Sequence, residues 1–154
     1  KPFHELAREL DIHVDVAALV PFARWVTPAV ERRRYDARFF VAVAPEGEAC
    51  HDESETVANA WMSPRAAVDA HLGAKIDLPP PTLRMLEELT TCATAAEVLA
   101  LARSRRPPLV RPVFRDLDGT WVLALPGDVE RPEKDLVLPG PTRFTIRDAR
   151  FVSG

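Results

Sequence analysis

The placement of proline limits what the second half of this chain can fold into. The sequence has 15 prolines in 154 residues, nearly twice the average frequency, and they gather at 79–81, 107–112 and 126–141. Proline lacks a backbone N–H and fixes φ, so it interrupts helix interiors and the hydrogen bonds between strands. We therefore expect much irregular chain in the second half, with only short helices and strands between the prolines.

Apolar spacing predicts one helix and a group of strands in the first half. The segment 2–10 places its apolar residues at i, i+3, i+4 and i+7, which is the stripe of a short helix. The runs 17–25 and 38–44 are apolar and rich in aromatic and β-branched residues, as buried strands are, and 58–62 resembles a further short strand.

Capping signals predict helices farther along the chain. Ser63 before Pro64 is typical of a helix start, and Gly73 is placed to end that helix. A second helix is expected to begin with Thr82 as its cap, because the three preceding prolines cannot continue a helix.

In the last third of the chain, the sequence pattern predicts one more helix and a set of strands. Thr94 and Glu97 form a capping box, and the arginines at 103–106 are expected to lie in solvent at the helix end. Asp118 and Gly119 indicate a hairpin turn. The predicted strands are 109–114, 120–125 and 143–152.

Composition narrows the class of protein. The net charge is −3, so no overall positive field would hold a nucleic acid or an anionic membrane. The longest apolar runs, such as 39–44, are far shorter than the roughly 20 residues that cross a bilayer. Cys50 and Cys92 form neither a disulfide framework nor a zinc motif. We expect a soluble cytoplasmic protein with no nucleic-acid or membrane partner.

Three clusters could carry chemistry, and each has a plainer interpretation. The segment 32–38 holds four arginines and a tyrosine, which could grip a phosphate or form an ordinary solvated loop. The acidic run 52–55 could bind a divalent cation or supply a base, or be an exposed turn. Trp25 could line a pocket or simply fill the core. The histidines have no metal-ligand spacing.

Several short motifs follow one another in a distinctive order in the first 90 residues. They are PFARWVTP at 21–28, RYDARFF at 34–40, Glu55 six residues before WMSP at 61–64, and PPT at 80–82. This order resembles the Nudix hydrolase superfamily, above all the branch that contains the peroxisomal coenzyme A diphosphatases and their bacterial relatives, and the similarity covers residues 3 to about 90.

The resemblance implies a fold of the α/β class. It predicts a Nudix-like α/β/α sandwich around a mixed sheet, incomplete here, with the helix from Pro64 packed on one face. The catalytic Nudix box, whose glutamates hold metal ions, has no counterpart in this sequence and is expected upstream. We expect residues 1–90 to be the C-terminal part of a Nudix-like domain and 91–154 to add a helix and a small β appendage. The implied strands are 19–25, 39–44 and 59–62.

The resemblance also implies an activity. The full protein is expected to cleave the pyrophosphate of a nucleoside diphosphate conjugate, above all coenzyme A or an acyl-CoA, with Mg²⁺ or Mn²⁺ held by upstream ligands. This chain alone is then expected to be inactive. Two alternatives stay open: a non-catalytic Nudix-like module that binds a nucleotide or a protein partner, and a fusion partner of a metallo-hydrolase whose C-terminal portion is a connector. The expected substrate is a small molecule. Association of the protein with copies of itself, as a homo-oligomer, is also open.

The matching positions imply roles for particular residues. Arg34 and Arg38 are expected to contact a substrate phosphate, and Asp36 shares their strand face and could orient them. Glu55 is the candidate for a catalytic base or metal ligand on a loop.

A separate prediction concerns the two tryptophans that lie in the matching motifs. Trp25 is a candidate substrate-binding residue, although Trp25 and Trp61 are both expected to lie mainly in the core.

Overall fold

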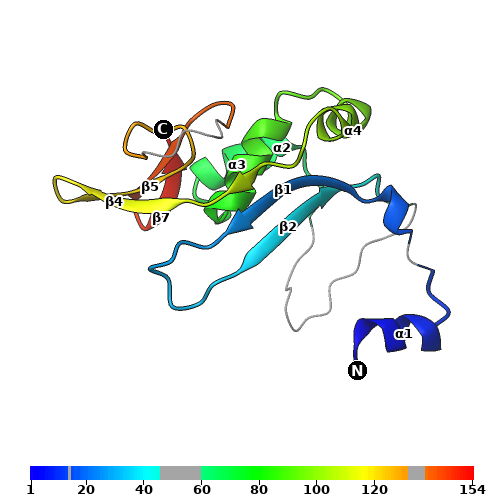
Figure 1. The fold of residues 1–154 in the computed structure, drawn as a ribbon. Coiled ribbons are helices and arrows are strands. Elements are labelled where there is room, and N and C mark those ends of the chain that lie inside the picture. The colour runs from blue at the N-terminus through cyan, green and yellow to red at the C-terminus, as the bar shows by residue number, and fades with distance from the viewer. Residues whose placement is uncertain (14, 46–59, 132–137) are drawn as a thin grey trace.

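The computed structural model describes residues 1–13, 15–45, 60–131 and 138–154. These residues form four α-helices, one short 3₁₀ helix and seven strands in two sheets (Figure 1). In the described part of the chain, no helix has both the length and the apolar character needed to cross a membrane.

The first sheet is mixed, as predicted, and we call it sheet A. Its central strand β1 (Val20–Val26) pairs antiparallel with β2 (Asp36–Val41) and parallel with β3 (Leu109–Val110). The turn between β1 and β2 is tied by the backbone N–H of Thr27, which donates to the carbonyl of Tyr35 at 3.0 Å. Strand β3 comes from the last third of the chain, so sheet A joins segments that are distant in the sequence.

The residues after the acidic run do not form the strand that we expected. Ala60, Trp61 and Met62 are the described part of that prediction, and none of them is in a strand. Trp61 is 77% exposed, so its assignment to the core is also wrong. Apolar composition and the family resemblance both predicted this strand, but no strand in the described part of the chain pairs with residues 60–62, so no ladder of backbone hydrogen bonds forms there.

The helices α2 (Pro64–Leu72) and α3 (Pro80–Leu89) pack against each other. Helix α2 begins and ends as predicted, with the Ser63 hydroxyl accepting from the N–H of Ala66 at 3.2 Å and Gly73 at the C-cap. Helix α3 begins earlier than predicted. Pro79 is its N-cap and the next two prolines occupy the first turn, where a missing N–H costs no hydrogen bond.

Helix α4 (Ala95–Arg103) confirms the capping box. The N–H of Glu97 donates to the Thr94 hydroxyl at 3.2 Å, and the Glu97 carboxylate accepts from the N–H of Ala93 at 2.8 Å. The arginine run after α4 is not all solvated. Arg105 forms two bonds of 2.5 and 2.9 Å with Glu88 of α3 and lies 5.3 Å from the ring centroid of Phe22.

The second sheet, sheet B, is an antiparallel meander in the order β4-β5-β6-β7. Asp118 and Gly119 form its first turn with φ values of 52° and 84°, which confirms the predicted hairpin. Two of the predicted strands are in fact two strands each. The segment 109–114 breaks before Pro112 and passes from sheet A to sheet B, and 143–152 turns back on itself. The strands are β4 (Val113–Leu117), β5 (Thr120–Ala124), β6 (Arg143–Arg147) and β7 (Arg150–Ser153).

One hydrophobic core spans both parts of the chain. Phe22 and Trp25 of β1 are buried with Leu83 of α3, and Val110 and Phe144 from the C-terminal part belong to the same cluster. These side chains are at most 4% exposed. The residues after 90 therefore contribute to the core of the whole molecule.

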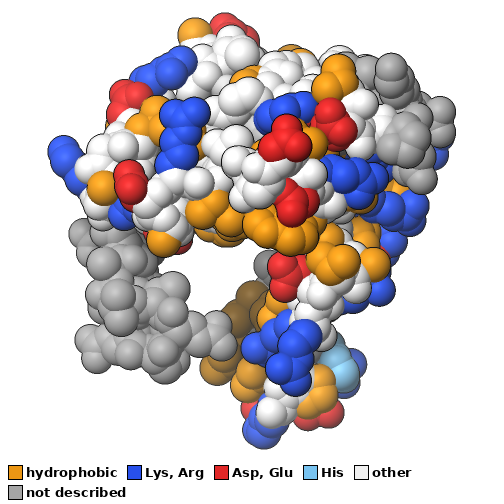
Figure 2. All heavy atoms as spheres, turned by 90° about the vertical axis from the view of Figure 1, so that its left-hand side faces the viewer, with side chains coloured by type: hydrophobic (Ala, Val, Ile, Leu, Met, Phe, Trp, Pro, Cys, Tyr) orange, Lys and Arg blue, Asp and Glu red, His pale blue; other side chains and the backbone are white. Residues whose placement is uncertain are grey.

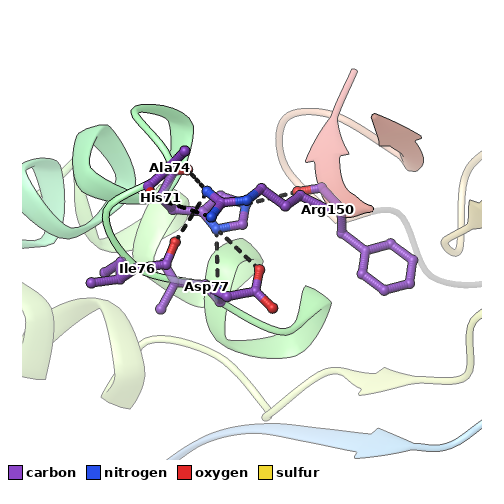
Figure 3. A network of polar contacts seen from close by, with 7 residues as sticks. His71, Ala74, Ile76, Asp77 and Arg150 are labelled. Atoms are coloured by element: carbon purple, nitrogen blue, oxygen red, sulfur yellow. Dashed lines mark hydrogen bonds and ion pairs between the residues drawn. The ribbon is translucent and has the colours of Figure 1, made fainter. Parts of the chain in front are cut away.

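A polar network joins the end of α2 to sheet B (Figure 3). Nε2 of the buried His71 lies 2.8 Å from the carbonyl of Phe151, and its Nδ1 accepts from the N–H of Leu78 at 3.1 Å. In this pattern Nδ1 is the acceptor and Nε2 the donor of the imidazole ring. The guanidinium of Arg150 donates to the carbonyls of His71, Ala74 and Ile76, at 3.0, 3.2 and 3.4 Å.

We expect Arg150→Ala to destabilise the protein by about 1.5–3 kcal/mol, since the carbonyls at the end of α2 lose a charged donor. Urea denaturation followed by circular dichroism measures this change. Arg147→Ala is the matched control, because Arg147 lies in the same hairpin and is exposed. Equal stability of the two variants would show that the network contributes nothing.

The outer face of sheet A has no helix over it among the described residues. Figure 1 shows α2, α3 and α4 on one side of the sheet and α1 (Phe3–Glu9) apart from the rest, and α1 has no buried residue. The short helix Val16–Ala18 leads into β1. The structure thus shows mixed α/β architecture compatible with a Nudix-like fold, and the complete α/β/α sandwich stays a prediction.

Candidate functional site

The outer face of sheet A carries a cluster of charged side chains at one end of β1 and β2. Arg24 lies opposite Arg38 in the pairing of the two strands. Arg24 also reaches diagonally to Asp36, with Nε to Oδ1 at 2.7 Å and Nη2 to Oδ2 at 2.5 Å. Such a paired contact fixes the plane of the guanidinium. Arg24, Asp36, Arg38 and Arg111 together are called the arginine cluster below.

Positive charges outnumber negative charges in the arginine cluster. Hydrogen bonds from Arg24 lower the pKa of Asp36, and the charges of Arg24, Arg38 and Arg111 act in the same direction, while burial opposes them. Asp36 in turn raises the pKa of Arg24. Three guanidinium groups thus act on one carboxylate, and the four residues together carry a net charge of +2 at an exposed surface. An anion with several oxygens, such as a phosphate, is the natural complement.

The structure changes the predicted set of phosphate-binding residues. Arg38 and Asp36 share one face of β2 as expected, but the partner of Asp36 is Arg24. Arg34 lies before β2 begins, is exposed, and is not among the charges that act on Asp36. Arg34 therefore stays a candidate by its motif position only.

Sequence reasoning missed two members of the cluster. Arg24 stands inside an apolar strand, and its position between two buried neighbours could have shown that it faces outward. Arg111 had no local signal, because it joins the cluster only through the pairing of β3 with β1. Glu55, the predicted loop base or metal ligand, lies outside the described residues.

A cavity lies at the same end of sheet A, on its inner side. Its volume is about 340 Å³. Trp25, 4% exposed, is both a core residue and part of the wall, and its role in substrate binding stays a prediction. Most of the lining is apolar, and it comes from the β1–β2 turn, the first turn of α3 and sheet B. The lining residues are Trp25, Val26, Thr27, Pro28, Glu31, Tyr35, Ala37, Pro80, Pro81, Pro112, Phe114, Leu123 and Phe151.

The described residues supply no metal site. Within 1–13, 15–45, 60–131 and 138–154, no three His, Cys, Asp or Glu side chains come together as ligands for an ion. The carboxylate of Asp36 is already held by two bonds from Arg24. Cys92 is a free thiol, and Cys50 is outside the described part. The donor set present here therefore does not fit a divalent cation.

Comparison with known proteins gives one family match. The family model of the NUDT19 Nudix domain matches residues 1–89, which is more than half of the chain. A curated relative, acyl-coenzyme A diphosphatase NUDT19 of Homo sapiens, is 31% identical over 99 residues, covering 62% of this chain and 26% of the human protein. The protein of the same name from Xenopus laevis is 27% identical over 139 residues, covering 85% of this chain and 37% of the frog protein.

The matched region is a limited part of these relatives. It spans between about a quarter and just over a third of their length. No solved structure matches this chain.

Proposed function

Since this chain belongs to the NUDT19 family of Nudix proteins, in the coenzyme A diphosphatase branch, we propose that the protein hydrolyses the diphosphate of coenzyme A or an acyl-CoA. Two relatives carry the name acyl-coenzyme A diphosphatase. The observation that carries the proposal in this chain is the arginine cluster, an exposed group with excess positive charge suited to a diphosphate.

The residues of the cluster have distinct parts in this proposal. Asp36 holds the guanidinium of Arg24 in a fixed plane, so it acts as a positioning residue. Arg38 has no hydrogen-bond partner among the described residues, so its donors are available to phosphate oxygens. Arg111 adds positive charge from β3. Asp36 thus holds Arg24 in place, while the exposed Arg38 and Arg111 supply further positive charge for the diphosphate oxygens.

The metal ions are proposed to be held mainly by residues upstream of Lys1. Nudix-type hydrolysis uses Mg²⁺ or Mn²⁺ to neutralise charge on the phosphate and to activate water. The described residues hold no donor set for such an ion, so we assign none of them as a ligand. Glu55 stays a proposed base or metal ligand by its motif position alone.

The test is an assay of the full-length protein, with any residues that precede Lys1 in the gene. We expect magnesium-dependent release of adenosine 3′,5′-bisphosphate and a phosphopantetheine product from coenzyme A. The 154-residue chain alone is expected to show no hydrolysis. Clear activity of that chain would refute the expectation that the metal ligands lie upstream of Lys1.

Binding measurements separate the enzyme from a non-catalytic module. Titration calorimetry with coenzyme A and the full-length protein detects binding whether or not hydrolysis occurs. Binding without hydrolysis in magnesium or manganese would favour a nucleotide-binding module. Neither binding nor hydrolysis would remove coenzyme A compounds as ligands of this protein.

A further inference from the structure

The 340 Å³ cavity beside the arginine cluster is a site that the proposed function does not yet use. Its walls come from two regions. Trp25 and Ala37 line it from sheet A, within the region that the family model matches, whereas Phe114, Leu123 and Phe151 line it from sheet B, beyond that region. The cavity therefore exists only because the C-terminal residues pack beside the family domain.

The chemistry of the walls favours an apolar occupant. Four prolines and the rings of Trp25 and Phe114 form much of the surface. Of the polar lining residues, Thr27 already bonds to Tyr35: its hydroxyl accepts the Tyr35 N–H at 2.9 Å. On the face drawn in Figure 2, hydrophobic side chains gather in a band along the lower margin of the main body. A cavity of this size and character is typical of a small-molecule site.

The cavity and the arginine cluster are neighbours across one sheet. Trp25 and Ala37 line the cavity, and Arg24 and Asp36 are the residues next to them in the chain. Successive strand residues point to opposite faces, so the anion-binding group lies outside the sheet and the apolar cavity inside it. A ligand that reaches both needs an anionic end and an apolar end joined by a long flexible arm that passes around the end of the sheet.

We propose that this cavity binds the acyl chain of the substrate, and that sheet B is the element that selects it. This inference rests on the proposed function, because an acyl-CoA has a diphosphate and a hydrocarbon chain joined by the flexible pantetheine arm. A cavity of about 340 Å³ lies within the size range of small-molecule sites, so it has room for part of a hydrocarbon chain.

The proposal predicts how affinity depends on chain length. Dissociation constants of the full-length protein are measured by calorimetry, without metal, for coenzyme A and for saturated acyl-CoAs from acetyl to dodecanoyl. We expect affinity to rise by up to about fourfold for each added methylene until the cavity is full, which corresponds to about 0.8 kcal/mol per buried methylene. Affinity independent of chain length would overturn the assignment.

Two substitutions change the cavity in opposite directions. Ala37→Phe fills it from β2 and is expected to lower the affinity ratio of octanoyl-CoA to coenzyme A at least about tenfold. Phe114→Ala enlarges it from sheet B and is expected to move the preferred chain to greater length. Ile146→Ala is the control, since Ile146 is exposed on sheet B and does not line the cavity. Thermal melting establishes that each variant is folded.

The results of these experiments distinguish a failure of the cavity assignment from a failure of the proposed enzymatic function. If the full-length protein hydrolyses acyl-CoAs but neither cavity variant changes chain preference, the cavity assignment is wrong and the proposed function stands. If chain-dependent binding responds to both variants but no hydrolysis is found, the cavity assignment stands and the enzymatic function fails. If Ala37→Phe does not fold, the result with Phe114→Ala decides, because an unchanged preference in that variant alone refutes the role of sheet B.

Discussion

Asp128→Ala is expected to destabilise the protein by about 2–4 kcal/mol, because several donors, among them the partly exposed guanidinium of Arg143, lose a buried charged acceptor. The Asp128 side chain is 1% exposed and accepts two bonds from Arg143, at 2.8 and 2.9 Å. The hydroxyl of Thr142 and the N–H of Glu130 donate to the same carboxylate, at 3.2 and 2.9 Å. All these donors lose their acceptor together.

Urea denaturation followed by circular dichroism measures the loss, with Glu130→Gln as the control. Glu130 is an exposed acid two residues away, so its neutral analogue should change the stability by less than about 0.5 kcal/mol. A loss below about 1 kcal/mol in Asp128→Ala would show that the bonds around the carboxylate are replaceable by water.

The same carboxylate gives a pH dependence with a defined sign. Burial raises the pKa of Asp128, but the bonds from Arg143, Glu130 and Thr142 outweigh it and lower the pKa. A carboxyl with a lowered pKa in the folded state stabilises the protein above its unfolded pKa, about 4. That stability is lost as the pH falls through the folded-state pKa. Asp128→Ala should lack this part of the acid dependence.

Arg38→Ala is expected to lower kcat/KM of the full-length protein for coenzyme A by about 10- to 200-fold. This range corresponds to about 1.5–3 kcal/mol for a charge-assisted hydrogen bond to phosphate. Arg38→Lys should keep part of the activity, since an ammonium retains the charge and loses the paired donors. Steady-state kinetics with saturating magnesium measures both variants.

Arg32→Ala serves as the comparison for this prediction. Arg32 is exposed in the β1–β2 turn and is not among the charges that act on Asp36. If Arg38→Ala and Arg32→Ala have the same kcat/KM as the unsubstituted protein, Arg38 does not contact the substrate. If both fall equally, a general positive field and not the cluster is responsible.

Local signals predicted the helices better than the strands. Ser63 and Thr94 cap their helices as expected, because a cap depends on residues within one turn. The strand predicted around Trp61 failed because a strand also needs a partner, and the sequence does not show where a partner lies. The sequence pattern also did not show that 109–114 would be divided between two sheets.

The same limit applies to the candidate site. Arg38 and Asp36 could be placed on one face of a strand from the alternation of side chains. The partner of Asp36 could not, because Arg24 reaches it only through the register of β1 and β2. Arg111 depends on a parallel pairing between segments more than eighty residues apart. Long-range pairing is thus what the sequence leaves undetermined here.

The pairing of β3 with β1 has a consequence for how such chains diverge. Val110 of β3 lies beside Trp25 of β1 in sheet A. The match to the family model ends at residue 89, so β3 lies beyond the matched region although it pairs with a strand inside that region. A substitution at either position alters the packing of the other. We expect the stretch around Val110 to be inherited together with the family domain, and an exchange of C-terminal segments between relatives to succeed only when the β1 residues are exchanged as well.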